Sequence, residues 1–152
     1  MAMNKNISLG KIFPPTFRLV AMPLVAELLI SLLMSAGSHK TTIFIIGDST
    51  AAEKGNYRNY PERGWGMVFQ GCFDDQIIVD NHAVNGRSSK SFLDEGRWQK
   101  VLDKMQPGDY VIIQFGHNDE KKFPDRYTIP GGTFDAHLAK YVNETRQKGG
   151  IP

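Results

Sequence analysis

Residues 41–50 read TTIFIIGDST, a run of β-branched and aromatic residues that ends in Gly-Asp-Ser. These residue types favour a strand. Because the run from Ile43 to Ile46 is apolar on successive positions, both faces of this strand are expected to be covered, as in the parallel sheets of α/β proteins. Ser49 therefore follows directly after a predicted buried strand.

From Thr41 onward, short apolar runs alternate with longer amphipathic segments, the pattern of βαβ units around a parallel sheet. Further strands are predicted at residues 76–80 and 109–115, and helices at 64–73, 92–105 and 134–148. Residues 119–132 lack periodicity and contain several Pro and Gly, so they are predicted to form an exposed loop. The alternation calls for another strand after the last helix, where the chain reaches Ile151 and Pro152.

The composition indicates one ordinary domain and excludes some functions. The chain has 152 residues, of which 41% are hydrophobic and 11% aromatic, enough for a real core. The net charge of +2 comes from the first 37 residues, and the remainder is formally neutral. Without a basic stripe or an RNA-binding aromatic motif, nucleic acid is not an expected partner.

Residues 1–37 resemble a secretory signal, with a basic stretch through Arg18, an apolar stretch over 19–34 and small residues after it. Cleavage is expected between Ala36 and Ser38. The apolar run is short of the roughly 20 residues that span a bilayer, so stable membrane association is not expected after cleavage, although an anchor or an unstructured leader is the alternative. Residues 38–152 are then predicted to form a secreted or periplasmic domain.

Three loops follow the three predicted strands, and each is rich in glycine and small polar residues. They read GDST over 47–50, NHAVNGRSS over 81–89 and GHND over 116–119. The right-handed crossover rule places all three at the carboxyl ends of the strands, where open α/β proteins bind ligands. A hydroxyl, a glycine amide and a carboxamide are therefore expected to meet at one site.

Those three groups suit acyl transfer, which needs a nucleophilic oxygen and rigid donors for the developing oxyanion. Ser49 can supply the oxygen. Gly86 offers a backbone N–H that a substrate can approach without a Cβ in the way, and Asn118 offers a side-chain N–H. A Gly-Asp-Ser triplet alone is also a common turn sequence, so the argument depends on the three blocks occurring in order.

The three blocks resemble, in order, the first three blocks of SGNH (GDSL-like) hydrolases. The segments that look most like the rhamnogalacturonan acetylesterase branch are Gly86-Arg87-Ser88-Ser89, Gly64-Trp65-Gly66 and 130–146. The resemblance covers about residues 41–152. It implies a flavodoxin-like three-layer α/β/α fold, no cofactor or metal, and removal of acetyl groups from pectic or related polysaccharides.

By this resemblance Ser49 is the nucleophile, and its own N–H joins Gly86 N–H and the Asn118 side chain in the oxyanion hole. Asp48 is expected to help fix the turn that presents Ser49. The family's last block, Asp-x-x-His, is not found in this sequence. Because a serine without its base is a poor nucleophile, the chain is interpreted as C-terminally truncated and nearly inactive.

Three histidines within the chain are candidates for a replacement base. His137, in Asp135-Ala136-His137, has the wrong spacing and lies at the start of a predicted helix. His82 and His117 are better interpreted as hydrogen-bonded loop or core residues than as bases. No residue of the sequence is therefore assigned as the general base.

Two other functions remain open at this stage: a carbohydrate-binding remnant without catalysis, and another SGNH esterase, lipase or thioesterase. Trp65 could stack on a sugar ring or pack in the core. Arg58, Arg87 and Lys90 could contact an acidic polysaccharide or be solvated surface charges. Cys72, the single cysteine, is predicted to be a buried small hydrophobe rather than a reactive thiol.

Overall fold

A computed structural model describes residues 39–55 and 61–152. The chain divides into two units, Met1–His39 and Lys40–Pro152, and all the strands and helices named below belong to the second. The predicted signal and Arg58 lie outside the described residues. Within the described ranges, no helix is long and apolar enough to cross a membrane.

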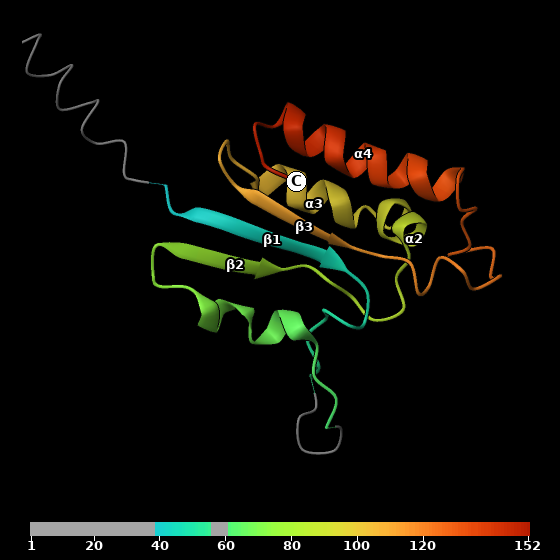
Figure 1. Cartoon of the computed structure of the whole chain (residues 1–152), viewed down its shortest axis with the longest axis horizontal. Helices are drawn as coiled ribbons and strands as arrows, with labels where there is room; N and C mark the ends of the chain where they lie inside the picture. Colours follow the sequence, from blue (N-terminus) through green and yellow to red (C-terminus); the bar gives the residue numbers. More distant parts are fainter. Residues whose placement is uncertain (1–38, 56–60) are drawn as a thin grey trace, which may run out of the picture. The chain divides into compact units, whose positions relative to one another are not determined.

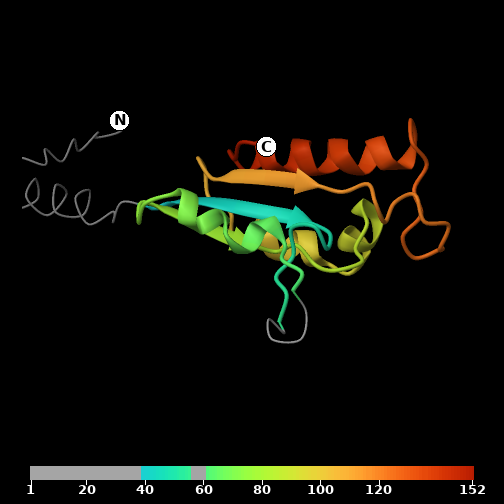
Figure 2. The same cartoon turned by 60° about the horizontal axis from the view of Figure 1, so that its bottom comes forward.

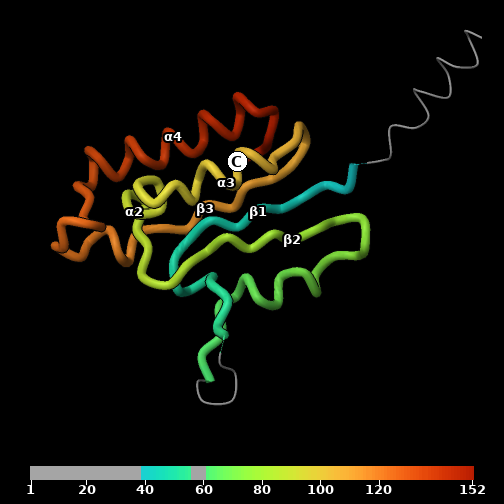
Figure 3. Tube along the Cα trace, turned by 180° about the vertical axis from the view of Figure 1, so that it is seen from behind, coloured from blue at the N-terminus to red at the C-terminus, as the bar shows by residue number. Residues whose placement is uncertain are grey.

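Three parallel strands form the sheet, with β1 in the centre (Figures 1 and 3). They are β1 (Thr41–Gly47), β2 (Ile77–Asn81) and β3 (Tyr110–Gln114). Ile45 of β1 pairs with Asn81 on one side and with Ile112 on the other. The predicted parallel α/β sheet is confirmed. The bounds of β2 and β3 differ from the predicted ones by one residue, and β1 extends beyond the predicted run Ile43–Ile46 at both ends.

The two faces of β1 are buried against different layers, as its continuous apolar run predicts. Phe44 and Ile46 pack into a core cluster with residues of the three helices. Ile45 lies in a second cluster on the opposite face, with Ala51, Ala52 and Ala83. All three of these strand residues are at most 2% exposed, so β1 is enclosed on both sides.

The three helices α2 (Ser89–Asp94), α3 (Arg97–Lys104) and α4 (Thr133–Gln147) form the layer that contributes to the first cluster (Figure 1). The single helix predicted over 92–105 is wrong, because Gly96 adopts a φ of +67° and divides it into α2 and α3. α4 agrees with its prediction and runs alongside β3 (Figure 2). Gly149, with a φ of +78°, follows its C-terminal end.

The opposite layer consists of two short 3₁₀ helices, η2 (Trp65–Met67) and η3 (Phe69–Cys72), in place of the single helix predicted for 64–73. Trp65 and Phe69 pack edge to face, with ring centroids 5.5 Å apart. Cys72, at the end of η3, is exposed, so the prediction that it is buried is wrong.

After α4 the chain returns to the sheet. Ile151 pairs in parallel with Tyr110, through hydrogen bonds from Val111 N–H to Ile151 O (2.9 Å) and from Ile151 N–H to Asp109 O (2.8 Å). The sequence pattern called for a further strand after the last helix, and the pairing observed at Ile151 agrees with it.

Candidate active site

Ser49 lies in the turn directly after β1 and is partly exposed. Its backbone N–H and its hydroxyl make no hydrogen bond within the described part of the chain. A serine whose hydroxyl and N–H are both available has the features that a nucleophile contributing its own amide to an oxyanion hole requires.

Asp48 holds this turn in shape. Its carboxylate is fully buried and accepts hydrogen bonds from Thr50 N–H (2.9 Å), the Thr50 hydroxyl (2.8 Å) and the Gln114 side chain (3.1 Å). The backbone carbonyl of Asp48 also accepts from Ala52 N–H at 3.0 Å. A side chain that bonds to the backbone two residues on is a common way to fix a tight turn. The expectation that Asp48 fixes the turn agrees with these bonds.

Gly86 lies in the loop after β2 and has a φ of +76°, a conformation that glycine adopts without strain. Its N–H makes no hydrogen bond among the residues that the structure describes. The loop is attached to the nucleophile turn, because Val84 N–H donates to Gly47 O at 3.0 Å. The structure therefore presents a second unpaired N–H from a loop joined to that of Ser49.

Asn118 is 1% exposed and lies in the loop after β3. Its side-chain Nδ2 donates to Arg87 O at 3.1 Å and lies 3.5 Å from Asp48 Oδ2. The first contact is an ordinary hydrogen bond, whereas the second is too long to be a strong one. One N–H of the carboxamide is thus engaged with the second loop, and the other is only weakly engaged. The three predicted donors lie on loops that contact one another.

Asp119 joins the second and third loops. The sequence did not predict this role, although Asp119 is the last residue of the GHND motif. It is 4% exposed, and its carboxylate accepts from Ser89 N–H (3.0 Å) and the Ser89 hydroxyl (2.5 Å). It also accepts from Gly116 N–H at 3.1 Å and the Thr128 hydroxyl at 2.9 Å. These bonds fix the position of the neighbouring Asn118.

Gly64 and Gly66 lie against the chain that follows Ser49. A Cβ on Gly64 would lie 2.1 Å from Ala52 O, and one on Gly66 would lie 2.6 Å from Ala51 O. Trp65 N–H donates to Thr50 O at 2.9 Å. The Gly64-Trp65-Gly66 segment therefore packs directly against the nucleophile turn, and only glycine fits at its two ends.

No histidine of the described residues is hydrogen-bonded to Ser49. His82 Nε2 lies 3.0 Å from Asp80 Oδ2, and His117, which is exposed, lies 3.6 Å from Glu120. His137 Nδ1 lies 3.2 Å from the hydroxyl of the fully buried Ser89. Each of these histidines contacts a group other than the predicted nucleophile.

The remaining candidate residues have structural contacts. Trp65 is partly buried and packs against the second core cluster. Arg87 Nε lies 3.2 Å from Glu95 Oε2, and Lys90 donates to Pro124 O at 2.8 Å. Within the described ranges, no three His, Cys, Asp or Glu side chains are grouped so as to hold a metal ion.

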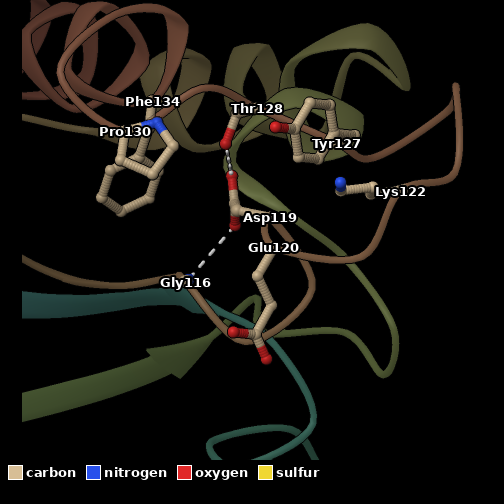
Figure 4. A pocket seen from close by; sticks show the side chains of 8 residues that line it. All are labelled: Gly116, Asp119, Glu120, Lys122, Tyr127, Thr128, Pro130 and Phe134. Carbon is tan, nitrogen blue, oxygen red and sulfur yellow. Dashed lines mark hydrogen bonds between the residues drawn. The ribbon is translucent and has the colours of Figure 1, made fainter.

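A cavity of about 490 Å³ adjoins the third loop (Figure 4). Tyr127, Pro130 and Phe134 supply apolar surface, and Glu120 and Lys122 supply charge. The Asp119 carboxylate faces the same space and is hydrogen-bonded to Gly116 and Thr128 there. Apolar walls with a few polar groups are typical of small-molecule sites.

The model of the GDSL-like lipase/acylhydrolase family matches residues 45–152, which include all three loops. The chain belongs to this family. Two proteins of Bacillus subtilis (strain 168) are each 41% identical to it: "Probable rhamnogalacturonan acetylesterase YesY" over 111 residues, and rhamnogalacturonan acetylesterase RhgT over 110 residues. The resemblance to SGNH hydrolases near the rhamnogalacturonan acetylesterases is thereby confirmed.

Each match covers 72% of this chain, but only 50% of YesY and 46% of RhgT. The chain thus spans about half the length of these curated relatives. Solved GDSL-like relatives share its fold. YxiM of Bacillus subtilis gives a TM-score of 0.60 at 25% identity, over 74% of this chain and 31% of that one. The esterase EstA of Pseudoalteromonas sp. gives a TM-score of 0.53 at 25% identity, and the match covers 72% of this chain and 56% of EstA.

Proposed function

We propose that this protein is a serine esterase that removes O-acetyl groups from pectic or related polysaccharides, with Ser49 as nucleophile. The observation that carries the proposal is the pair of unpaired N–H groups at Ser49 and Gly86, on two loops that are bonded together. The names of the relatives YesY and RhgT support the choice of an acetylated pectic substrate.

The chemistry would proceed in two steps. Ser49 Oγ attacks the acetyl carbonyl, and the negative charge on its oxygen is stabilised by Ser49 N–H, Gly86 N–H and the Asn118 side chain. A base, imidazole in the test below, takes the Ser49 hydroxyl proton and gives it to the sugar oxygen as the bond between that oxygen and the acetyl carbon breaks. Water then attacks the acyl-serine with help from the same base, which releases acetate and restores the Ser49 hydroxyl. Each lost donor of this kind typically lowers the rate about 100- to 1,000-fold.

We also propose that the 152-residue chain by itself turns over substrate slowly. Removing the base of a serine hydrolase typically lowers the rate by several orders of magnitude, and no histidine in the described ranges is hydrogen-bonded to Ser49. The Asp-x-x-His block that supplies the base in the family has no counterpart in the sequence. Residues 1–37 are proposed to direct export, so that the protein acts outside the cytoplasm.

The test is acetate release from acetylated rhamnogalacturonan by the purified chain, with and without added imidazole as a small-molecule base. We expect release close to background without imidazole, and a larger release with it that Ser49→Ala removes. Imidazole hydrolyses esters by itself, so the Ser49→Ala protein also serves as the control for that background. Equal release by both proteins in imidazole would overturn the proposal.

A carbohydrate-binding role without catalysis is the second candidate, favoured by the aromatic cavity beside the third loop. It predicts that the chain binds acetylated pectin, that Tyr127→Ala weakens this binding, and that no Ser49-dependent acetate appears even with imidazole. A different SGNH esterase or lipase would instead hydrolyse long acyl esters faster than acetyl esters, which a comparison of chain lengths would show.

A further inference from the structure

Lys54 bridges the two loops that carry the unpaired N–H groups. Its Nζ donates to Ser49 O at 2.7 Å and to Asn85 Oδ1 at 2.8 Å. The side chain is 11% exposed, and its nearest carboxylate in the described residues, that of the exposed Glu62, is 4.0 Å away. The ammonium group is therefore held mainly by neutral oxygens, one from each loop.

This bridge restrains the relative position of the two loops. Ser49 is the nucleophile of the proposed reaction, and Asn85 directly precedes Gly86. Oxyanion donors act only when they are held in position before the charge develops, because then no reorganisation is needed during the reaction. A single side chain bonded to both loops provides such a restraint.

Lys121 acts on the third donor. Its Nζ donates to Asn118 Oδ1 at 3.0 Å, and its backbone N–H donates to Asn118 O at 3.3 Å. A cation at the carboxamide oxygen fixes which end of the amide is the donor. It also draws electron density away from Nδ2, which makes the N–H groups there stronger donors.

We propose that Lys54 and Lys121 are positioning residues for the oxyanion hole: Lys54 aligns the Ser49 and Gly86 loops, and Lys121 orients and polarises the Asn118 amide. The inference rests on the proposed esterase function. Neither lysine is assigned a contact with substrate. Their positive charges also favour a negative charge nearby, because charge interactions at partly buried sites are less screened than in water.

The first experiment is NMR of the intact chain, and it does not depend on activity. In Lys54→Met we expect the Ser49 and Gly86 amide resonances to shift, because the two loops lose the side chain that bridges them. In Lys121→Met we expect the Asn118 side-chain amide resonances to move. Lys100→Met, which removes an exposed lysine of α3, should leave all of these resonances unchanged.

The second experiment measures imidazole-dependent hydrolysis of 4-nitrophenyl acetate, corrected with Ser49→Ala. For either lysine we expect kcat to fall about 10-fold, less than for complete loss of a donor, with little change in KM. Lys121→Arg should restore part of the rate. Lys54→Gln keeps a hydrogen-bond donor without the charge and should retain the loop alignment. It replaces Lys54→Met in these experiments if Lys54→Met does not fold.

The two experiments separate the possible failures. Unchanged Ser49, Gly86 and Asn118 resonances in the lysine variants would overturn the inference, whatever the activity. A rise in KM with unchanged kcat would also overturn it, because it would indicate substrate contact. Absence of any Ser49-dependent hydrolysis in the wild-type chain would overturn the proposed function, while the NMR result would still decide what the lysines do.

Discussion

The carboxylate of Asp119 accepts hydrogen bonds from both the backbone N–H and the hydroxyl of Ser89, at 3.0 and 2.5 Å. Ser89 is the first residue of α2, so this contact joins the end of the second loop to the third loop. The remaining bonds of Asp119, to Gly116 and Thr128, extend the connection to both sides of its own loop. One buried carboxylate thus holds together the backbone on which Asn118 is placed.

Replacing Asp119 with Ala should therefore destabilise the protein. The buried N–H group of Ser89 and the partly buried one of Gly116 would lose their acceptor, and we expect the free energy of unfolding to fall by about 3 kcal/mol. Urea unfolding followed by circular dichroism measures this. The control is Asp103→Ala, at an exposed carboxylate on α3, which should change stability by less than about 0.5 kcal/mol. Similar losses in both variants would contradict the role given to Asp119.

Gly64→Ala should destabilise the chain by about 1–3 kcal/mol, because the new Cβ would overlap Ala52 O and the backbone beside the nucleophile turn must move. Gly71→Ala is the matched control, since a Cβ there meets nothing within 4 Å. Thermal melting of both variants tests the difference. Equal melting temperatures would show that the segment around Gly64 can move to accommodate the Cβ without loss of stability, and would contradict the prediction.

Trp98 reports on the ionisation of Glu144, to which its Nε1 donates at 2.6 Å. Burial raises the pKa of Glu144, but hydrogen bonds from Lys140 and Trp98 outweigh it and leave the pKa below its usual value. The folded state therefore binds a proton less readily than the unfolded state. The resulting stability is present above the unfolded pKa and is lost as the pH falls through the lower folded pKa.

With Trp65→Phe as background, Trp98 is the only tryptophan, and its fluorescence should change at a pH below that expected for a free glutamate. Glu144→Gln should abolish the change. If the fluorescence change persists in Glu144→Gln, it arises from the ionisation of another group, and the prediction is wrong.

Tyr141 should remain protonated in strongly alkaline solution. Burial, together with the nearby carboxylate of Asp119, raises the pKa of its hydroxyl far above the usual value, and this hydroxyl donates to Ser89 O at 2.7 Å. Above about pH 10 the unfolded state loses this proton and the folded state keeps it, so stability should decrease as the pH rises.

Absorbance at 295 nm should contain a tyrosine component that appears only on unfolding. Tyr141→Phe should remove that component and lower stability at neutral pH by about 1 kcal/mol, through loss of one hydrogen bond. Titration of all tyrosines in the folded range would contradict the assignment.

The periodicity of the sequence was sufficient for the sheet and for α4, because Ile43 to Ile46 and the apolar positions around Tyr141 carry strong local patterns. The periodicity did not predict the break at Gly96, because the apolar spacing continues through this residue. Only the backbone geometry shows that Gly96 has a left-handed conformation. Cys72 was misjudged because residue type indicates burial only on average, whereas the end of η3 faces solvent.

The sequence by itself determined the parallel α/β fold and the three loops that carry Ser49, Gly86 and Asn118, since these follow from local patterns and from the handedness of parallel crossovers. The family followed from the resemblance of those three loops to known sequence blocks. Only the tertiary structure decided how the loops are held together. The contacts of Asp119, Lys54 and Lys121 join residues of separate loops or depend on how a side chain is oriented. The contacts of Asp119 and Lys54 exist only after packing has brought separate loops together, and the contact of Lys121 with Asn118 depends on the conformation that their loop takes in the fold.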